Sequence, residues 1–341
     1  KKGYSQQDSG PFSCDPALAN KQADAFFAAK KKNWRFTSCP STSWLETLPL
    51  VWAPRQLTMI DIGCNKGYTS AHFFSTFASQ LGLNVKTVHE AVKQRLAGSK
   101  FTGGACGVCG DCNDNIPPPT PPGWPVPDVH CVEPNPSTFD LLKNTRQVHA
   151  NRPGGGALAD SWHIHNLGMA EADRPLMFEG TSSEKDACQN AGQETCSMVD
   201  EHSKTGVGTV TVTGSSVQSF FLKNHILSTD ILKIDAEGYD PLVLEGAYPV
   251  LAAGKAKVLL FEYHGIGVWK MDANSLQAVV EKLDVYGFDC YLDGSPELTR
   301  LTRCWVPRFE FRWWSNVVCF KRDDTGLADA ILNQHATFLW Q

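Results

Sequence analysis

The fold of this chain is decided by the stretch Leu57-Thr58-Met59-Ile60-Asp61-Ile62-Gly63-Cys64-Asn65-Lys66-Gly67-Tyr68-Thr69. An apolar run of strand character ends in an acid, a glycine-rich turn follows, and a helical pattern begins at about Tyr68. This order is typical of the first unit of a doubly wound α/β sheet, where ligands bind at the carboxyl ends of the strands. The two glycines let the backbone approach a ligand closely. The sequence therefore predicts a ligand site at this turn.

The spacing of the two glycines indicates which ligand. It is Gly-x-x-x-Gly, not the Gly-x-Gly-x-x-Gly of dinucleotide enzymes, which disfavours an NAD-dependent oxidoreductase. The pattern Asp-x-Gly-x-Asn-x-Gly over residues 61–67 points instead to S-adenosylmethionine (SAM), whose ammonium Asp61 would engage. The N–H groups at the start of the following helix can hold a carboxylate or phosphate. A glycine turn in some other α/β protein is the alternative.

Composition excludes some partners and favours others. The chain has 341 residues, enough to bury a large core in one elaborated domain or in two. Charged residues make up 20% and the net charge is −5, without a basic run interleaved with aromatic residues, so no nucleic-acid partner is expected. No apolar stretch approaches the roughly 18–20 residues of a membrane-spanning helix, so no membrane segment is expected in this chain.

Cysteine usage bears on the cellular compartment. The chain holds 12 cysteines, an even number, and several of them fall in predicted loops. This pattern favours disulfides and an oxidising compartment, so we predict the secretory pathway, either the Golgi lumen or secretion. The alternative is a cytoplasmic chain with buried free thiols.

Residues of about 84–128 are predicted to be an insertion between the first two strands. Residues 85–96 are predicted to form a short helix or strand. The proline tract at 117–127 cannot lie inside a sheet. Between them, Cys106, Cys109 and Cys112 could supply three zinc ligands or form disulfides with distant cysteines. Disulfides are the favoured interpretation.

Acids follow the later predicted strands as well. Glu133 follows the second strand, where an acid can hold a ribose diol, and a helix starts at Pro136. The third strand holds His163 and His165, which share a face and are interpreted as surface residues. The strands at 229–234 and 257–263 end in further ionisable groups. Together the strand ends bring to one rim Asp61, Glu133, Asp235, Glu237, Glu262 and His264.

The two ends of the chain flank this core. Residues 1–56 are predicted to be an N-terminal extension that covers the sheet as a lid or is purely structural, and residues 323–341 a C-terminal tail. Strands are expected at 288–292 and 316–322. The aromatic stretch between them holds Trp305, Trp313 and Trp314, which would suit a sugar-binding acceptor site or would pack in the core.

Four segments resemble, in order and spacing, the FkbM-type SAM-dependent methyltransferases: 59–68, 132–136, 166–170 and 230–238. Residues 314–319 look like the last strand of eukaryotic members. The resemblance implies a class I (Rossmann-like) methyltransferase domain over 57–322, with a mostly parallel seven-stranded sheet, an antiparallel last strand and helices on both faces. The insertion and residues 180–204 depart from the minimal domain.

The resemblance also implies an activity, SAM-dependent O-methyl transfer to a hydroxyl. The expected acceptor is a sugar or glycan, with a small natural product as the alternative. A non-catalytic secreted protein that keeps the fold is a further alternative. The implied cofactor-binding residues are Asp61, Gly63, Asn65, Gly67, Tyr68, Glu133, Pro134, Asn135, Gly168, Met169 and Asp235.

Removing the proton of a sugar hydroxyl requires a base or a metal ion. The expected catalytic residues are Asp235, Glu237 and His264. Carboxylates at one edge also suit a hard cation, so Mg²⁺ bound by Asp235, Glu237 and Glu262 is a possible addition.

Overall fold

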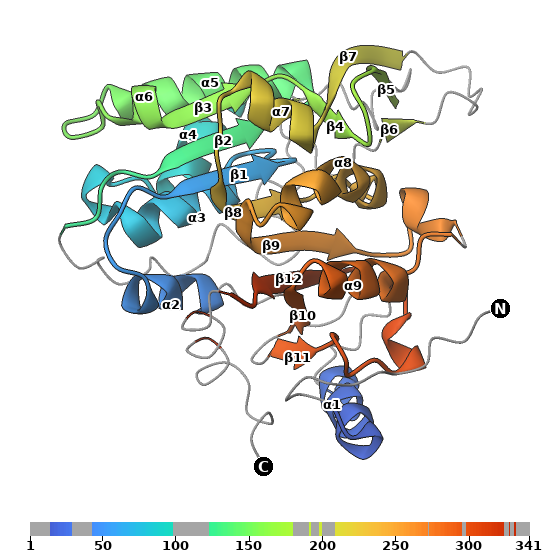
Figure 1. The fold of residues 1–341 in the computed structure, drawn as a ribbon. Coiled ribbons are helices and arrows are strands. Elements are labelled where there is room, and N and C mark those ends of the chain that lie inside the picture. The colour runs from blue at the N-terminus through green and yellow to red at the C-terminus, as the bar shows by residue number, and fades with distance from the viewer. Residues whose placement is uncertain are drawn as a thin grey trace.

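A computed structural model describes residues 14–28, 43–97, 123–179, 191, 198–199, 209–271, 273–294, 298–323, 327 and 331. A large sheet lies at its centre, with the strand order β11-β10-β12-β9-β8-β1-β2-β3 (Figure 1). The strands, in chain order, are β1 (Thr58–Ile62), β2 (Asp128–Val132), β3 (Trp162–His165), β8 (Thr229–Ile234), β9 (Ala256–Tyr263), β10 (Phe288–Asp293), β11 (Leu298–Arg300) and β12 (Ser315–Lys321).

The sheet is mostly parallel, as the sequence predicts. The strands β3, β2, β1, β8 and β9 pair in parallel, while β12 runs antiparallel to both β9 and β10. The sheet has eight strands instead of the predicted seven. The extra strand arises because residues 298–300 turn back and pair antiparallel with β10 at the edge.

Helices cover both faces of this sheet and enclose two apolar cores (Figure 1). One core lies against α2 (Ser43–Val51), α3 (Tyr68–Phe77), α4 (Val85–Leu96), α5 (Pro136–Ala150) and α6 (Leu158–Ser161). The other lies against α1 (Pro16–Ala28), α7 (Val217–Lys223), α8 (Asp240–Ala252) and α9 (Leu276–Val285). Short 3₁₀ turns add η1 (Ser79–Leu81), η3 (Gly267–Lys270) and η4 (Pro307–Phe309).

A second, smaller sheet has the order β4-β7-β5-β6. Its strands are β4 (Gly168–Ala170), β5 (Pro175–Glu179), β6 (Met198–Val199) and β7 (Thr209–Ser216). Two of them, β5 and β7, pair antiparallel and correspond to the two short strands predicted around residues 175–178 and 208–213. This sheet lies beside α7 and α8 (Figure 1).

Part of the predicted insertion is regular structure. Residues 85–96 form α4, whose first turn is stabilised by Asn84: its side chain accepts a hydrogen bond from the backbone N–H of Thr87 at 3.0 Å. Because α4 packs into the core on α3 and α5, this segment belongs to the helical layer and is not a surface excursion. Cys106, Cys109 and Cys112, and also Cys188 and Cys196, lie outside the described residues.

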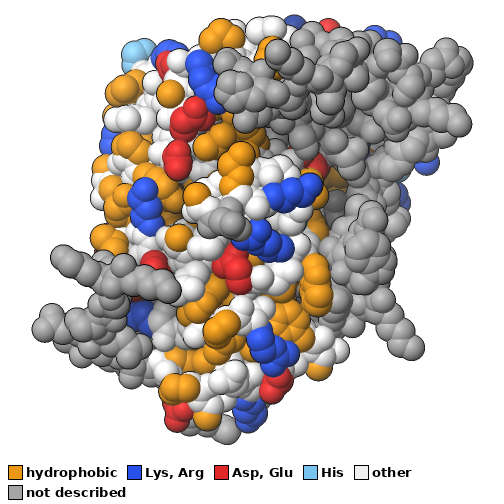
Figure 2. Space-filling view, turned by 90° about the vertical axis from the view of Figure 1, so that its right-hand side faces the viewer, with side chains coloured by type: hydrophobic (Ala, Val, Ile, Leu, Met, Phe, Trp, Pro, Cys, Tyr) orange, Lys and Arg blue, Asp and Glu red, His pale blue; other side chains and the backbone are white. Residues whose placement is uncertain are grey.

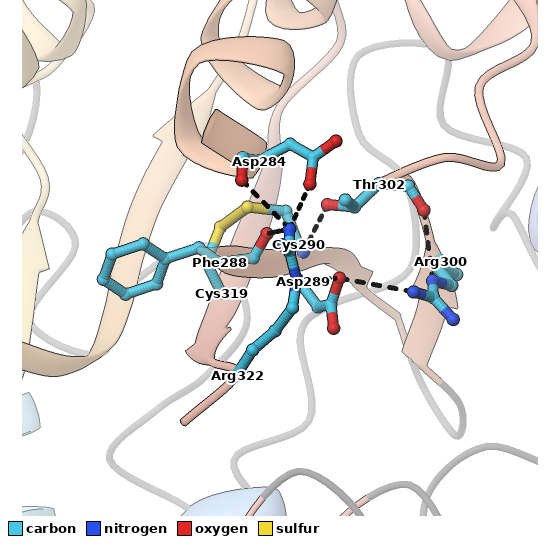
Figure 3. Close-up of a disulfide and its surroundings, with 8 residues drawn as sticks. All are labelled: Asp284, Phe288, Asp289, Cys290, Arg300, Thr302, Cys319 and Arg322. Carbon is cyan, nitrogen blue, oxygen red and sulfur yellow. Dashed lines mark hydrogen bonds and ion pairs between the residues drawn. A yellow bond between two sulfur atoms is a disulfide. The ribbon is translucent and has the colours of Figure 1, made fainter. Parts of the chain in front are cut away.

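The six cysteines in the described part of the chain form three disulfides: Cys14–Cys304, Cys64–Cys131 and Cys290–Cys319. The last joins paired residues of β10 and β12 (Figure 3). Beside it, Arg322 donates to Asp289 Oδ1 at 3.1 Å, and Arg300 donates to the same oxygen at 3.2 Å. The sheet edge is thus held by a covalent bond and a charge network.

The N-terminal segment is joined to the core by covalent and apolar contacts. Cys14, just before α1, is bonded to Cys304, and the ring of Phe26 packs 5.9 Å from that of Phe311. The helix α2 lies in the same apolar core as α3. The division into extension, domain and tail stays a prediction. Among the described residues, none of the helices has both the length and the apolar character that crossing a bilayer requires.

Candidate active site

The glycine turn after β1 is packed directly against the end of β8. Gly63 has φ +72° and donates its N–H to the carbonyl of Val132 at 2.9 Å. A Cβ at this position would lie 1.7 Å from the carbonyl oxygen of Asp235. Gly67, with φ +80°, precedes the first residue of α3. Glycine at 63 is therefore required both by dihedral angle and by space, and it brings three strand ends together.

A disulfide adds a covalent tie to this turn. Cys64 lies within the turn and Cys131 lies on β2, and their bond is buried in the core beneath α3. Cys64 also donates its N–H to the carbonyl of Val132 at 3.3 Å. The position of the turn relative to β2 is consequently fixed by hydrogen bonds and by a covalent link.

Asp61 is fully buried at the end of β1 and is held by two neighbours. Its Oδ2 accepts a hydrogen bond from the hydroxyl of Ser70 at 2.7 Å, and its Oδ1 lies 3.1 Å from the ammonium of Lys233. Asp61 and Lys233 are paired residues of β1 and β8. The predicted contact of Asp61 with a ligand ammonium stays a prediction.

Lys233 is a site residue that sequence reasoning missed. Its ammonium lies 3.1 Å from Asp61, 3.0 Å from Asp235 Oδ2 and 3.2 Å from the carbonyl oxygen of Gly63. Burial opposes the charge of this lysine, but Asp235 and Asp61 outweigh it and raise the lysine pKa. Lys233 thus joins two predicted site acids to the glycine turn. In the sequence, the only sign of this role was a lysine within a buried strand, two residues before Asp235.

Glu133, at the end of β2, holds two loops together. Its Oε2 accepts the backbone N–H of Asn65 at 3.0 Å, and its Oε1 accepts the backbone N–H of Asn135 at 2.8 Å. Burial raises the pKa of Glu133 to about 7, against the opposing effect of these two N–H groups. The carboxylate retains lone pairs beyond these two bonds, so it can still accept from a ligand hydroxyl.

Several other predicted cofactor-binding residues make contacts within the protein itself. Asn135 caps α5 by accepting from the N–H of Ser137 at 2.9 Å. The hydroxyl of Tyr68 lies 2.7 Å from Nδ1 of His89 on α4. Gly168 and Met169 are buried at the start of the smaller sheet, and the carbonyl of Pro134 accepts from the side chain of Asn166 at 3.0 Å. Their roles toward a cofactor stay predictions.

The loop after β8 presents Asp235 and encloses a second acid. Asp235 is partly exposed, with its side chain 28% accessible. Glu237 takes φ +51° and is partly buried. Behind them, fully buried Asp240 accepts the N–H groups of Ala236 at 3.3 Å and of Gly238 at 3.1 Å. The buried acid therefore shapes the loop that carries the two predicted catalytic carboxylates.

Glu262 and His264 form a buried pair at the end of β9. His264 Nε2 lies 3.8 Å from Glu262 Oε2, and within the described residues neither atom has a hydrogen-bond partner. Burial lowers the pKa of His264 to about 4, so its imidazole is neutral at pH 7. Burial, followed by the charges of Asp235, Glu237 and Asp240, raises the pKa of Glu262 well above its usual range. Two buried polar atoms are thus left to meet a ligand.

Trp314, one of three tryptophans proposed to bind an acceptor, does reach this pair. Its indole N–H donates to Glu262 Oε1 at 2.7 Å. Trp305 packs on Phe309, with ring centroids 5.8 Å apart, and Trp313 packs on Phe311 at 5.7 Å. Of the three, Trp314 has a hydrogen bond to a predicted site residue.

The predicted magnesium site finds no support. Among the described residues, the donor atoms of Asp235, Glu237 and Glu262 do not all come within 4.8 Å of one another. Asp235 is instead paired with a lysine, and Glu262 with an indole. Asp235 and Glu237 both follow β8, whereas Glu262 lies near the end of β9. Sharing one edge of the sheet is therefore not enough to bring the three carboxylates together.

The carboxyl ends of the parallel strands lie on the right in Figure 1, the side that faces the viewer in Figure 2. In the coloured part of that face, acidic, basic and hydrophobic side chains are interspersed (Figure 2). The sheet order, the antiparallel β12 and the acids at the ends of β1, β2 and β8 define a class I methyltransferase fold.

The family follows from comparison with known proteins. The family model of the methyltransferase FkbM domain matches residues 122–290. Residues 122–290 therefore form an FkbM methyltransferase domain, and three of the four sequence motifs, at 132–136, 166–170 and 230–238, lie within this range. A comparison with curated proteins gave no match.

Comparison with solved structures gave matches of low sequence identity and low TM-score. The methyltransferase FkbM from Methylobacillus flagellatus KT is 10% identical, with TM-score 0.40, over 88% of this chain and 58% of that chain. The precorrin-6y C5,15-methyltransferase from Geobacter metallireducens GS-15 is 10% identical, with TM-score 0.32, over 88% and 95%. The human methyltransferase 10 domain containing protein is 8% identical, with TM-score 0.32, over 91% and 99%.

Methyltransferases of this family use SAM, and the residues present fit it. Glu133 keeps acceptor capacity for a ribose diol while it orders the glycine turn. Gly63 and Gly67, both at positive φ, give the turn its shape. The orphaned polar atoms of Glu262 and His264 lie at the end of β9, two strands from the turn.

Proposed function

We propose that this protein is a SAM-dependent O-methyltransferase that methylates a hydroxyl of a sugar or glycan. The observation that carries this is the position of Asp235, a partly exposed carboxylate fixed by buried Lys233 at the end of β8. It lies between the glycine turn and the buried Glu262–His264 pair in the strand order. A small natural product is the alternative acceptor.

Bound SAM would supply an electrophilic methyl group. The protein residues must orient the acceptor hydroxyl and remove its proton, because a sugar hydroxyl does not ionise by itself at neutral pH. Asp235 is assigned as the base that accepts this proton. Lys233 keeps the Asp235 carboxylate in place through their 3.0 Å ion pair. His264 is neutral at pH 7 and can exchange hydrogen bonds with the acceptor, with Glu262 beside it. Glu237 is proposed as a further carboxylate next to Asp235.

The acceptor class rests on the polar and aromatic groups at β9 and β12. Trp314 donates to Glu262 and so combines an aromatic surface with a buried carboxyl. Aromatic faces with adjacent hydrogen-bonding groups suit the apolar faces and hydroxyls of sugars. The proposed partner is therefore a glycan or small-molecule hydroxyl and not a nucleic acid.

The proposed location is the secretory pathway. It is supported by three disulfides in the described part of the chain, since disulfides persist in oxidising compartments. Mass analysis after thiol alkylation without reductant tests this. Full alkylation of the six described cysteines in protein isolated from its natural source would favour the cytoplasm.

The experiment for the activity uses Asp235→Asn with labelled SAM and a panel of sugars and glycans. We expect loss of turnover by about 10²–10⁴-fold, the usual contribution of a general base. Binding of S-adenosylhomocysteine, measured by calorimetry, should be nearly unchanged. The control is Glu281→Gln, an exposed carboxylate on α9 bonded to Gln277. Unchanged turnover in Asp235→Asn would remove this residue from the mechanism, and no transfer by the wild type to any acceptor would favour a non-catalytic protein.

A further inference from the structure

Four polar side chains gather on one face of β2 and β3. Asp128 and His130 alternate on β2, and His163 and His165 alternate on the edge strand β3. His130 and His163 are directly paired across the two strands. Asp128 begins β2, whereas Glu133 of the candidate active site follows its end. Asp128 therefore lies at the opposite end of β2 from Glu133, whereas His165 ends β3 beside it and accepts the N–H of Glu133 with its carbonyl at 2.9 Å.

The donor atoms of three of these residues converge. His163 Nε2 lies 2.8 Å from Asp128 Oδ1, and His130 Nε2 lies 3.6 Å from Asp128 Oδ2. One possible ligand atom from each of the three residues lies within 4.8 Å of the other two. Among the described residues, no other group of three His, Cys, Asp or Glu side chains meets this criterion. Ligands held about 2.0–2.1 Å from a tetrahedral zinc ion lie roughly 3.4 Å apart, so small side-chain adjustments would suffice.

The carboxylate of Asp128 lies between the two imidazoles. Its Oδ1 is buried, and His163 Nε2 lies 2.8 Å from this oxygen. A cation placed between the carboxylate and the two imidazoles would take over these contacts and bind all three side chains at once.

His165 holds His130 from the other side. Nδ1 of His130 lies 3.1 Å from Nε2 of His165, which leaves Nε2 of His130 directed at Asp128. The ring of Phe220 on α7 meets His165 edge-on, with centroids 4.9 Å apart. Histidine ligands of metal ions are commonly oriented in this way by a hydrogen bond to their second ring nitrogen.

The cluster is open to solvent on one side. The side chains of Asp128 and His163 are 37% and 38% accessible, while that of His130 is 8% accessible. An ion can therefore enter without unfolding of the sheet, and water can complete its coordination.

We propose that Asp128, His130 and His163 bind one divalent transition-metal ion, with zinc favoured, and that this ion ties β2 to the edge strand β3. Two imidazoles with one carboxylate form a donor set that suits zinc better than magnesium or calcium, which prefer oxygen ligands alone. Water takes the fourth position. This site is distinct from Cys106, Cys109 and Cys112, for which the sequence leaves zinc open as the alternative to disulfides.

The experiment titrates chelator-treated, thiol-alkylated full-length protein with ZnCl₂ by calorimetry and with CoCl₂ by visible absorption. We expect one ion per chain with micromolar affinity and a tetrahedral Co²⁺ spectrum lacking the sulfur-to-cobalt charge-transfer band. The absence of that band separates this site from cysteine ligation. A free metal concentration of about 100 times Kd should raise the Tm by roughly 4 °C.

The variant His163→Asn should lower the affinity at least tenfold, because it removes a ligand on an exposed edge. His165→Asn should lower it by about 10-fold through loss of orientation, while the Co²⁺ geometry is retained. His225→Asn, which changes an exposed histidine outside the cluster, is the matched control. Circular dichroism and S-adenosylhomocysteine binding check that each variant is folded.

The outcomes separate clearly. Loss of metal binding in His163→Asn with retention in His225→Asn supports the site. Equal binding in wild type and His163→Asn, or no binding by the wild type at 100 times the protein concentration in either titration, overturns it. A sulfur-to-cobalt band that persists in His163→Asn would place the metal on cysteines and would also overturn it.

Discussion

The ammonium of Lys233 lies 3.0 Å from Oδ2 of Asp235, in the loop that follows β8. The same ammonium lies 3.1 Å from fully buried Asp61 on β1. One buried cation therefore joins the proposed base to the acid beside the glycine turn. The position of Asp235 therefore depends on this buried lysine.

Replacing Lys233 with methionine should destabilise the protein strongly. The variant leaves Asp61 buried without its cation, and removing one partner of a buried ion pair costs about 3–5 kcal/mol. Urea unfolding at pH 7 measures this. The control is Lys223→Met, which breaks the exposed pair with Asp173 and should cost under about 1 kcal/mol. Equal losses in the two variants would contradict the assigned role of Lys233.

Asp240 should make stability fall as the pH rises. Burial, followed by the charge of Asp235, raises the pKa of Asp240 to about 7 in the folded state. Between its unfolded value near 4 and about pH 7, the folded state thus holds a proton that the unfolded chain has released. Stability from this group is present at low pH and is lost as the pH rises through that window.

The measurement for Asp240 is the Tm between pH 5 and 8 in wild type and in Asp240→Asn. The neutral amide cannot ionise, so the decline of Tm with pH should be shallower in the variant. Glu281→Gln on the surface should follow the wild type. A variant that declines as steeply as wild type would exclude Asp240 as the source.

Gly63→Ala should disable the site, while a second glycine provides a matched comparison. Both Gly63 and Gly82 have positive φ, at +72° and +64°. A Cβ at Gly63 would meet the Asp235 carbonyl at 1.7 Å, whereas at Gly82 nothing lies within 4 Å. Gly82→Ala should cost about 1–2 kcal/mol from the dihedral angle alone. Gly63→Ala should cost more and should also abolish S-adenosylhomocysteine binding in calorimetry; wild-type affinity would refute the packing argument.

The disulfide between Cys64 and Cys131 should matter for cofactor affinity. The bond closes a loop of 67 residues, which corresponds to about 4 kcal/mol in the chain-entropy account. We expect the double variant to alanine to lose stability and to bind S-adenosylhomocysteine at least several-fold more weakly, because the glycine turn is released. The control removes Cys290–Cys319, which should lower stability without changing that affinity. Equal affinity in both double variants would show that the turn does not need its disulfide.

The sequence predicted the parts of the fold that depend on local patterns. The apolar run before Gly63, the acid after β2 and the run ending at Asp235 each indicate a strand end, and β1, β2 and β8 are adjacent in the sheet. The antiparallel last strand followed from the resemblance and is confirmed. The edge strand β11 was missed because three residues carry too little periodicity to be distinguished from a loop.

By itself, then, the sequence determined the class of fold, the glycine turn and which acids follow the strands, since these are set by residues near one another in the chain. Only the tertiary structure decided the partners. The register of β1 on β8 pairs Asp61 with Lys233, and the register of β2 on β3 pairs His130 with His163. The same structure keeps the oxygens of Asp235, Glu237 and Glu262 from converging. Distances of a few ångströms between separate strands depend on packing and register, which no short stretch of sequence encodes.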